Sequence, residues 1–208
     1  MSAGQIAKPY IAQAAVNKAM YATRNSYHFR LFHHLDPNRP PAWSKILALK
    51  TVIRSREYDW IMWIDGDALF TNFGTRIESL LPRNPAIDFM ITRDCNDINT
   101  GSFLMRASKS ALLSLEEIYG GPHVTSQVLE DLWWEQRSFI SLYNANVDLR
   151  NRTLEVPQKT FNAYPPDYGC NEEGGTGWSE ADFVIHFPGA PDELRENLTA
   201  EYLKKVIF

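Results

Sequence analysis

An α/β fold, with a mixed central sheet covered by helices on both faces, accounts best for this sequence. The chain has 208 residues, of which 44% are hydrophobic, and this suits one large domain with a sizeable core. Apolar runs of strand length alternate along the chain with segments of helical periodicity. No internal repeat, low-complexity run or linker divides the chain, so we treat residues 1–208 as a single domain.

The first half of the chain predicts helix, loop, helix and strand in that order. Residues 6–22 carry apolar and small side chains at helical spacing, and an extended stretch follows at residues 27–32. The proline-rich residues 36–41 predict a loop, and residues 43–55 predict the next helix. Residues 58–64 are a nearly continuous apolar run, which is typical of a central strand buried on both faces.

The second half continues the alternation. Short runs rich in aromatic and β-branched residues predict strands at residues 87–92, 102–106, 153–156 and 182–187. Apolar residues at helical spacing predict helices at residues 108–119, 126–142 and 192–205. Ser108 is a suitable N-cap for the first of these helices.

Composition and short signals narrow the classes of function. The formal net charge of −4 disfavours nucleic-acid binding, which usually needs a basic surface. We expect no transmembrane segment, because the apolar runs fall short of the roughly 18 residues that span a bilayer. Residues 1–8 lack the features of a signal peptide. Cys95 and Cys170 allow at most one internal disulfide, and the sequence leaves their pairing open.

Two carboxylates at the end of the most apolar strand candidate are the most informative feature. Ligands of open α/β sheets bind beyond the carboxyl ends of strands, and Asp65 and Asp67 lie at such an end. Their i, i+2 spacing lets both side chains point the same way, and like charges so placed favour a bound cation. We therefore predict a divalent metal, Mg²⁺ or Mn²⁺. The alternative is a pair that only opens a turn.

A second strand candidate ends at His186, and Pro188 and Gly189 follow it. An imidazole added to two carboxylates would favour Mn²⁺, so His186 is the candidate third ligand. A hydrogen-bonded structural histidine is the alternative. The Pro-Gly loop lets the backbone of Gly189 approach a ligand closely.

Residues 94–103 are rich in short amides and carboxylates. Asp94, Asn99 and Gly101 suit the recognition of hydroxyl groups, although a polar turn before a strand is an equally good interpretation. A calcium-binding loop is excluded, because the twelfth position from Asp94 is Met105 and not Glu.

Taken in chain order, these segments and several others resemble the galactosyl/xylosyl/mannosyl transferase family, which includes fungal α-1,2-galactosyltransferases and plant xyloglucan xylosyltransferases. The resemblance covers roughly residues 21–189. The matching motifs are Ala42-Trp43-Ser44-Lys45-Ile46, Trp63-Ile64-Asp65-Gly66-Asp67-Ala68, Asn99-Thr100-Gly101-Ser102-Phe103, Glu135-Gln136, Val156-Pro157-Gln158-Lys159 with Asn162-Ala163-Tyr164, and residues 182–189.

The resemblance implies a GT-A-like, Rossmann-related fold and transfer of a hexose or pentose with retention of anomeric configuration. It implies a nucleotide-sugar donor, with a UDP-sugar favoured over GDP-mannose, an oligosaccharide or glycoprotein acceptor, and Mn²⁺ with Mg²⁺ as the alternative. Relatives work in the Golgi lumen on an N-terminal anchor. The chain is thus expected there if an anchor was removed, and otherwise as a soluble viral or cytoplasmic protein.

The resemblance also assigns roles to residues of this chain. Asp65 and Asp67 match the Asp-x-Asp pair that holds the metal and donor, and His186 completes the metal shell. Asn99 and Gly101 match a segment beside the sugar.

The expected reacting centre lies at Glu135 and Gln136. Xylosyltransferases carry two adjacent acidic residues before the Gln, whereas this chain has Trp134 and Glu135, so Glu135 is the candidate nucleophile or charge stabiliser. Relatives often have a Lys soon after the His-Phe-x-Gly motif, where this chain has Ala190-Pro191. Neutralisation of the donor diphosphate is therefore expected to rest on the metal and Lys45. Relatives also begin with a strand that holds the base, and residues 1–8 are too short and polar to supply it.

Aromatic side chains are candidates for stacking on acceptor sugars, because sugar rings offer amphipathic faces. Trp178, in a glycine-rich loop, is expected to be the best exposed of Trp133, Trp134, Phe161, Tyr164 and Trp178. Two other functions remain open at this point. The chain could be a catalytically silent carbohydrate-binding module, or an aspartyl-nucleophile phosphatase, although the latter would need Ser or Thr at the position of Leu69.

Overall fold

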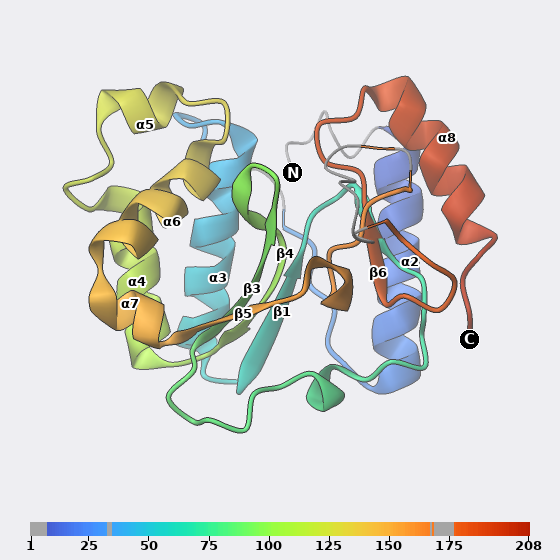
Figure 1. Ribbon diagram of the computed structural model, residues 1–208, viewed down its shortest axis with the longest axis horizontal. Helices are drawn as coiled ribbons and strands as arrows, with labels where there is room; N and C mark the ends of the chain where they lie inside the picture. The colour runs from blue at the N-terminus through green and yellow to red at the C-terminus, as the bar shows by residue number, and fades with distance from the viewer. Residues whose placement is uncertain (1–7, 33–34, 167, 169–176) are drawn as a thin grey trace.

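The computed structural model describes residues 8–32, 35–166, 168 and 177–208. The helices are α2 Pro9–Asn25, α3 Ser44–Ser55, α4 Lys109–Gly120, α5 Ser126–Glu130, α6 Trp134–Ala145, α7 Val147–Asn151 and α8 Asp192–Leu203. The strands are β1 Trp60–Ile64, β2 Ala68–Phe70, β3 Phe89–Asp94, β4 Asp97–Arg106, β5 Thr153–Val156 and β6 Val184–His186. Helices α3 to α7 lie on one side of the strands, and α2 and α8 lie on the other (Figure 1).

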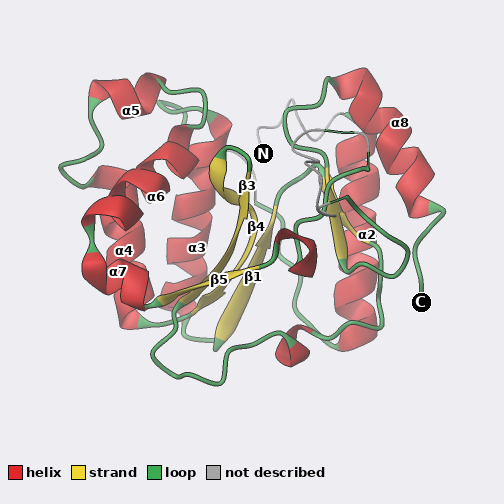
Figure 2. Cartoon of the chain, viewed as in Figure 1, coloured by secondary structure: helices red, strands yellow, loops and turns green. Residues whose placement is uncertain are grey.

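The larger sheet has four strands in the order β1-β4-β3-β5 (Figure 2). Strand β4 runs antiparallel to both β1 and β3, whereas β3 and β5 are parallel, so the sheet is mixed as predicted. Strands β3 and β4 form a hairpin in which Asp94 pairs with Asp97. The backbone N–H of Asn96 donates to Asp94 Oδ1 at 2.7 Å, a local bond that favours a tight turn.

Each face of the larger sheet is covered by a separate apolar core. On one face, side chains of α3, α4 and α6 such as Ile46, Leu115 and Phe139 pack on β3 and β4. On the other face lies a second sheet, formed by the antiparallel pair β2-β6. Helices α2 and α8 cover this second sheet, with Ala14 and Tyr202 in the core beside β2 and β6. The predicted α/β architecture with helices on both sides is confirmed.

Strand β1 corrects one prediction. It was expected to be central, but among the described strands it pairs with β4 alone and is an edge strand, and all five of its residues are half-buried. Its apolar run is explained by its two faces, since Ile61 and Trp63 contact one core and Trp60 and Met62 contact the other. Its unpaired edge is left to line a cleft, which is described below.

The predicted helix over residues 126–142 is also wrong in part. It is split into α5 and α6, and Leu132, between them, is 85% exposed rather than buried. Asp131 explains the break, because its Oδ1 accepts a hydrogen bond from the backbone N–H of Trp133 at 2.8 Å and its Oδ2 accepts one from Arg137 Nε at 3.0 Å. The strand β2 and the helix α7 were not predicted, since each is only a few residues long. Residues 27–32, predicted to be extended, lie in a loop.

Candidate active site

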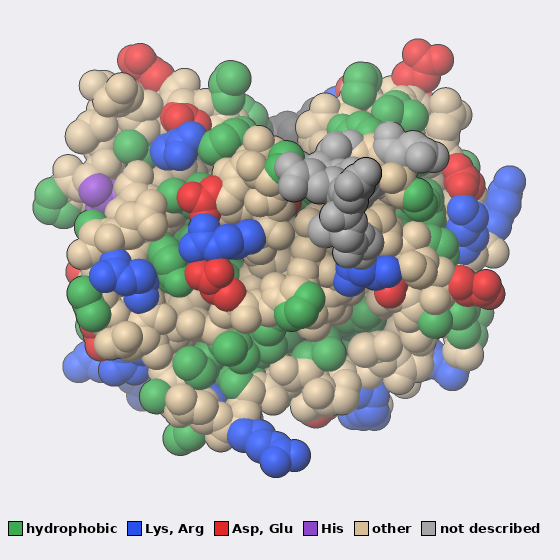
Figure 3. Space-filling view, viewed as in Figure 1, with side chains coloured by type: hydrophobic (Ala, Val, Ile, Leu, Met, Phe, Trp, Pro, Cys, Tyr) green, Lys and Arg blue, Asp and Glu red, His purple; other side chains and the backbone are tan. Residues whose placement is uncertain are grey.

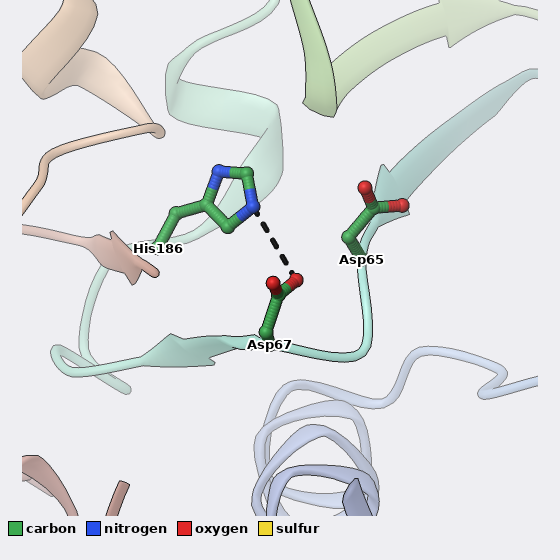
Figure 4. A group of neighbouring side chains, drawn as sticks. All are labelled: Asp65, Asp67 and His186. Carbon is green, nitrogen blue, oxygen red and sulfur yellow. Dashed lines mark ion pairs between the residues drawn. The ribbon is translucent and has the colours of Figure 1, made fainter. Parts of the chain in front are cut away.

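Asp65 and Asp67 converge with His186 at the end of β1, as the sequence predicts. Asp65 follows β1, where its backbone N–H donates to the carbonyl of Gly101 at 2.7 Å. Asp67 directly precedes β2, and the pairing of Ala68 with His186 brings β6 beside it. One ligand atom from each of the three residues lies within 4.8 Å of the others. Figure 4 shows His186 and Asp67 pointing toward one another, with Asp65 beside them at the end of β1.

Hydrogen bonds set the orientation of the His186 ring. The Asn162 Nδ2 donates to Thr92 Oγ1 at 2.9 Å and to Asn99 Oδ1 at 3.1 Å, so its Oδ1 is left as an acceptor. That Oδ1 lies 2.8 Å from His186 Nδ1, which therefore carries the proton. When the ring is neutral, its lone pair is therefore on Nε2, which lies 3.4 Å from Asp67 Oδ1. This is the tautomer that a metal ligand needs, and it is held by a hydrogen-bonded amide.

Gly101 makes room for the same ring. A Cβ at this position would lie 2.2 Å from Cε1 of His186 and 2.9 Å from each ring nitrogen. Any side chain here would therefore displace the imidazole. The Gly101 N–H also donates to Asn99 Oδ1 at 2.9 Å, which links the glycine to the Asn162 network.

The three donor groups fit a divalent cation. Two carboxylates and one neutral imidazole are a mixed oxygen and nitrogen set, which suits Mn²⁺ better than Mg²⁺. Arg195 Nη2 contacts Asp67 Oδ2 at 2.9 Å. Burial alone would raise the pKa of Asp67, but the contact with the His186 imidazole and the charge of Arg195 outweigh it and lower that pKa to about 2. Asp67 is thus ionised and available as a ligand at neutral pH.

Lys45 and Glu135 form a buried ion pair beside Asp65. Lys45 Nζ donates to Glu135 Oε1 at 2.8 Å and to the carbonyl of Thr100 at 2.8 Å, and it lies 3.3 Å from Asp65 Oδ1. Burial tends to lower the pKa of Lys45, but the charges of Asp65 and Glu135 prevail and raise it. The cation that was expected to neutralise a diphosphate is therefore already engaged by two carboxylates.

The remaining predicted residues lie around this centre. Gln136 Oε1 accepts from the backbone N–H of Thr100 at 2.9 Å, so Gln136 and Glu135 hold the same strand residue. The Asp94 Oδ2 accepts from Tyr164 Oη at 2.6 Å and from Asn99 Nδ2 at 3.0 Å. Burial, followed by the charge of Asp94, raises the pKa of Tyr164.

These residues all line one cleft of about 1060 Å³. It lies between α2 and β1, and Figure 3 shows the surface hollowed between the helices labelled α5 and α8 in Figure 1. The cleft is lined by every site residue that the sequence predicted, namely Lys45, Asp65, Asp67, Asp94, Asn99, Gly101, Glu135, Gln136, His186 and Gly189. Gly189 has a φ of +70°, which a glycine adopts without strain.

The aromatic prediction is wrong for Trp178. It is 9% exposed and packs in the core against Tyr202, and its Nε1 donates to Thr71 Oγ1 at 3.0 Å. Phe161 is also buried. Trp133 and Trp134 line the cleft and remain the candidates for stacking on a sugar. Cys95 is disulfide-bonded, and Cys170 lies outside the described residues.

Sequence reasoning missed three residues that shape the site. Asn162 was quoted as part of a motif without a role, whereas it sets the tautomer of His186. Arg195 and Lys18 were not considered, because their helices are remote in sequence from the Asp65–Asp67 segment. Only the spacing of cleft-facing residues along α2 could have indicated Lys18.

The profile of the galactosyl transferase GMA12/MNN10 family matches residues 2–84 and 82–194. The chain belongs to this family. The predicted family resemblance is therefore confirmed, and the family argues against an aspartyl-nucleophile phosphatase.

Individual relatives agree with the family match. The chain is 26% identical to an uncharacterized α-1,2-galactosyltransferase of Schizosaccharomyces pombe over 87% of its own length and 56% of the relative's. It is 27% identical to the probable α-1,6-mannosyltransferase MNN10 of Saccharomyces cerevisiae over 83% of its length and 53% of that protein's. The chain thus spans about half the length of these curated relatives.

Solved structures share the fold at low sequence identity. A glycosyltransferase involved in the glycosylation of the major capsid of PBCV-1 superposes with a TM-score of 0.74 at 14% identity, covering 93% of this chain and 94% of that one. The galactosyltransferase LgtC, solved with donor and acceptor sugar analogs, superposes with a TM-score of 0.57 at 10% identity, covering 96% and 97%. The predicted GT-A-like fold is confirmed by these likenesses.

Proposed function

We propose that residues 1–208 form the catalytic domain of a retaining, metal-dependent glycosyltransferase. It would transfer a hexose or pentose from a nucleotide sugar, a UDP-sugar before GDP-mannose, to an oligosaccharide or glycoprotein. The observation that carries this proposal is the convergence of Asp65, Asp67 and a correctly protonated His186 in a large cleft. The family and the donor-bound relative LgtC support it.

Asp65, Asp67 and His186 would hold the Mn²⁺, with Mg²⁺ as the alternative. When bound, the ion supplies Lewis-acid stabilisation of the charge that develops on the departing diphosphate. The chain's own residues orient this centre. Asn162 and Gly101 keep His186 in place, and Trp63 Nε1 donates to Asp65 Oδ1 at 2.7 Å.

Two routes to retention are compatible with the residues near the triad. In the first, the Glu135 carboxylate attacks the sugar carbon as the nucleoside diphosphate departs, and the acceptor hydroxyl then displaces Glu135 from the glycosyl intermediate. In the second, the acceptor attacks from the face that the leaving group departs, and the Gln136 amide stabilises the positive charge on the sugar. Glu135 is 3% exposed and paired with Lys45, which favours a charge-stabilising role and the second route.

The location proposed is the Golgi lumen, in line with the relatives. The disulfide-bonded state of Cys95 supports an oxidising compartment. In the part of the chain that the structure describes, no helix is long and apolar enough to cross a membrane.

The proposal is tested by a thermal-shift panel of UDP-, GDP- and dTDP-sugars with and without Mn²⁺, followed by donor turnover. A true donor binds only the native state and raises the Tm in a Mn²⁺-dependent way. We expect one donor to do so and to be hydrolysed or transferred, and chelation to abolish that turnover. Full turnover in excess chelator would refute the metal dependence. Glycan binding without donor turnover would support the silent carbohydrate-binding module instead.

A further inference from the structure

Lys18 is a buried cation in the wall of the cleft. The cleft-lining residues of α2 include Ile11, Ala15, Lys18 and Ala22, whose spacing places them along one face of the helix. The other three are apolar. Lys18 is 5% exposed, and its Nζ makes no hydrogen bond to any residue that the structure describes. A single ammonium is therefore embedded in an apolar stripe that faces the site.

A buried ammonium without hydrogen bonds is unfavourable, because burial removes its bound water and no acceptor among the described residues takes the place of that water. Burial lowers the pKa of Lys18 to about 8, although the charges of Asp67 and Asp65 oppose the shift. The two carboxylates are thus near enough to affect the pKa of Lys18. Among the contacts of the described residues, however, neither forms an ion pair with it.

The other cations of the described cleft wall already have partners. These pairs are Arg30 with Glu57, Lys45 with Glu135, and Arg195 with Asp67. Lys18 differs from them because all three of its N–H donors are unassigned. Lys18 therefore offers a positive charge and three hydrogen-bond donors at a place where the described residues present no acceptor, and an anion would complement both.

The position of Lys18 relative to the triad is rigidly set by its neighbour in sequence. Asn17 Nδ2 donates to the carbonyl of Phe70 at 2.9 Å, and Asn17 Oδ1 accepts from the backbone N–H of Phe70 at 2.9 Å. These two hydrogen bonds hold α2 against β2, the strand that begins directly after Asp67. Lys18 is therefore presented to the space beside the metal ligands without a movement of the helix.

We propose that Lys18 binds a phosphate oxygen of the donor's diphosphate, an inference that rests on the proposed nucleotide-sugar function. A diphosphate bound next to Asp65 and Asp67 would bring acceptor oxygens to the side of the triad that α2 lines. Charge-assisted bonds from an ammonium to phosphate are strong, and here a dry wall strengthens them further. Lys18 thereby takes the part that sequence reasoning gave to Lys45.

The test compares Lys18→Met with a matched control, Lys109→Met, which removes an exposed lysine of α4 outside the cleft. Calorimetry measures the binding of UDP and GDP in the presence of Mn²⁺, and of uridine and guanosine as phosphate-free probes. We expect Lys18→Met to weaken the binding of the preferred nucleoside diphosphate by about 10- to 100-fold, the range for losing a charged hydrogen bond. The control and the phosphate-free probes should show no change.

Binding of Mn²⁺ alone separates this role from an indirect one. Removing a positive charge near Asp65 and Asp67 should leave Mn²⁺ affinity unchanged or tighter, so an equal loss of Mn²⁺ and nucleotide affinity would overturn the inference. Unchanged nucleotide affinity in a folded Lys18→Met would also overturn it while leaving the proposed function intact. If wild-type protein binds neither nucleotide with Mn²⁺, both proposals fail. Lys18→Gln, a neutral polar variant, provides the same comparison if the methionine variant does not fold.

Discussion

Replacing Gly101 with alanine tests whether the imidazole of His186 must occupy its observed place. The new Cβ would lie 2.2 Å from Cε1 of His186, whereas carbon atoms pack at about 3.5 Å or more. The ring would have to move by at least about 1 Å to relieve this contact. It is 2% exposed and held by Asn162, so such a movement disturbs the bond that sets its tautomer.

Displacement of the His186 ring should weaken the binding of the metal. We expect Gly101→Ala to lower Mn²⁺ affinity by about 10- to 100-fold, or about 1.4 to 2.8 kcal/mol, the scale seen when the support of a ligand is lost. Manganese binding measured by electron paramagnetic resonance checks this directly, without a need for substrate. Thermal unfolding of the same samples reports whether the variant is folded.

Two further variants make this experiment decisive. Gly120→Ala is the matched control, because a Cβ at Gly120 would meet nothing within 4 Å, and its Mn²⁺ affinity should be unchanged. In a His186→Ala background, Gly101→Ala should change Mn²⁺ affinity by less than about twofold, since the clash has been removed. A folded Gly101→Ala protein with wild-type Mn²⁺ affinity would refute the ligand role of His186.

Three other predictions follow from the same geometry. Asp67→Asn should abolish Mn²⁺-dependent donor turnover with an unaltered circular dichroism spectrum, and retained turnover would contradict its ligand role. Glu135→Gln should lower kcat by about 100-fold with little change in donor KM. If Glu135→Gln instead keeps a near-normal kcat and Gln136→Ala loses most of its kcat, the catalytic role belongs to the Gln136 amide. Because burial lowers the pKa of Lys18 to about 8, the folded protein releases this proton at a lower pH than the unfolded chain, so wild-type stability gains as pH rises from about 8 toward 10.5. Lys18→Met should therefore be more stable than wild type to urea at pH 7 and lose this advantage progressively as the pH rises from about 8 to 10.5, and an advantage independent of pH would contradict the burial of a charge.

The convergence of Asp65, Asp67 and His186 was predictable because its signals are local. Asp65 and Asp67 follow an apolar run that had to end at a sheet edge, and His186 ends another such run. A strand end fixes the direction of its last side chains, so the order of elements was enough to bring these three together. Glycine at position 101 could be predicted to lie in the site, but the ring it accommodates could not, because that contact joins β4 to β6.

The errors arise where tertiary contacts outweigh local pattern. The apolar run of β1 has two covered faces, yet hydropathy does not report whether its second edge is paired. Trp178 follows a glycine-rich stretch, but its ring is buried by Tyr202 of α8. Lys18 is in the same category, since a lysine in a helix is ordinarily solvated and only the packing of α2 against β2 encloses it.

The charges around the triad link metal and donor. Three carboxylates face three cations there, so the formal charges of these six groups balance before a metal or a donor binds. These groups are Asp65, Asp67, Glu135, Lys18, Lys45 and Arg195. A divalent metal alone adds two positive charges and competes with Arg195 for Asp67, whereas a nucleotide-sugar diphosphate carries about two negative charges and restores the balance. Metal and donor should therefore strengthen each other's binding by the same factor, as linkage requires, and UDP should lower the Kd for Mn²⁺ as much as Mn²⁺ lowers the Kd for UDP.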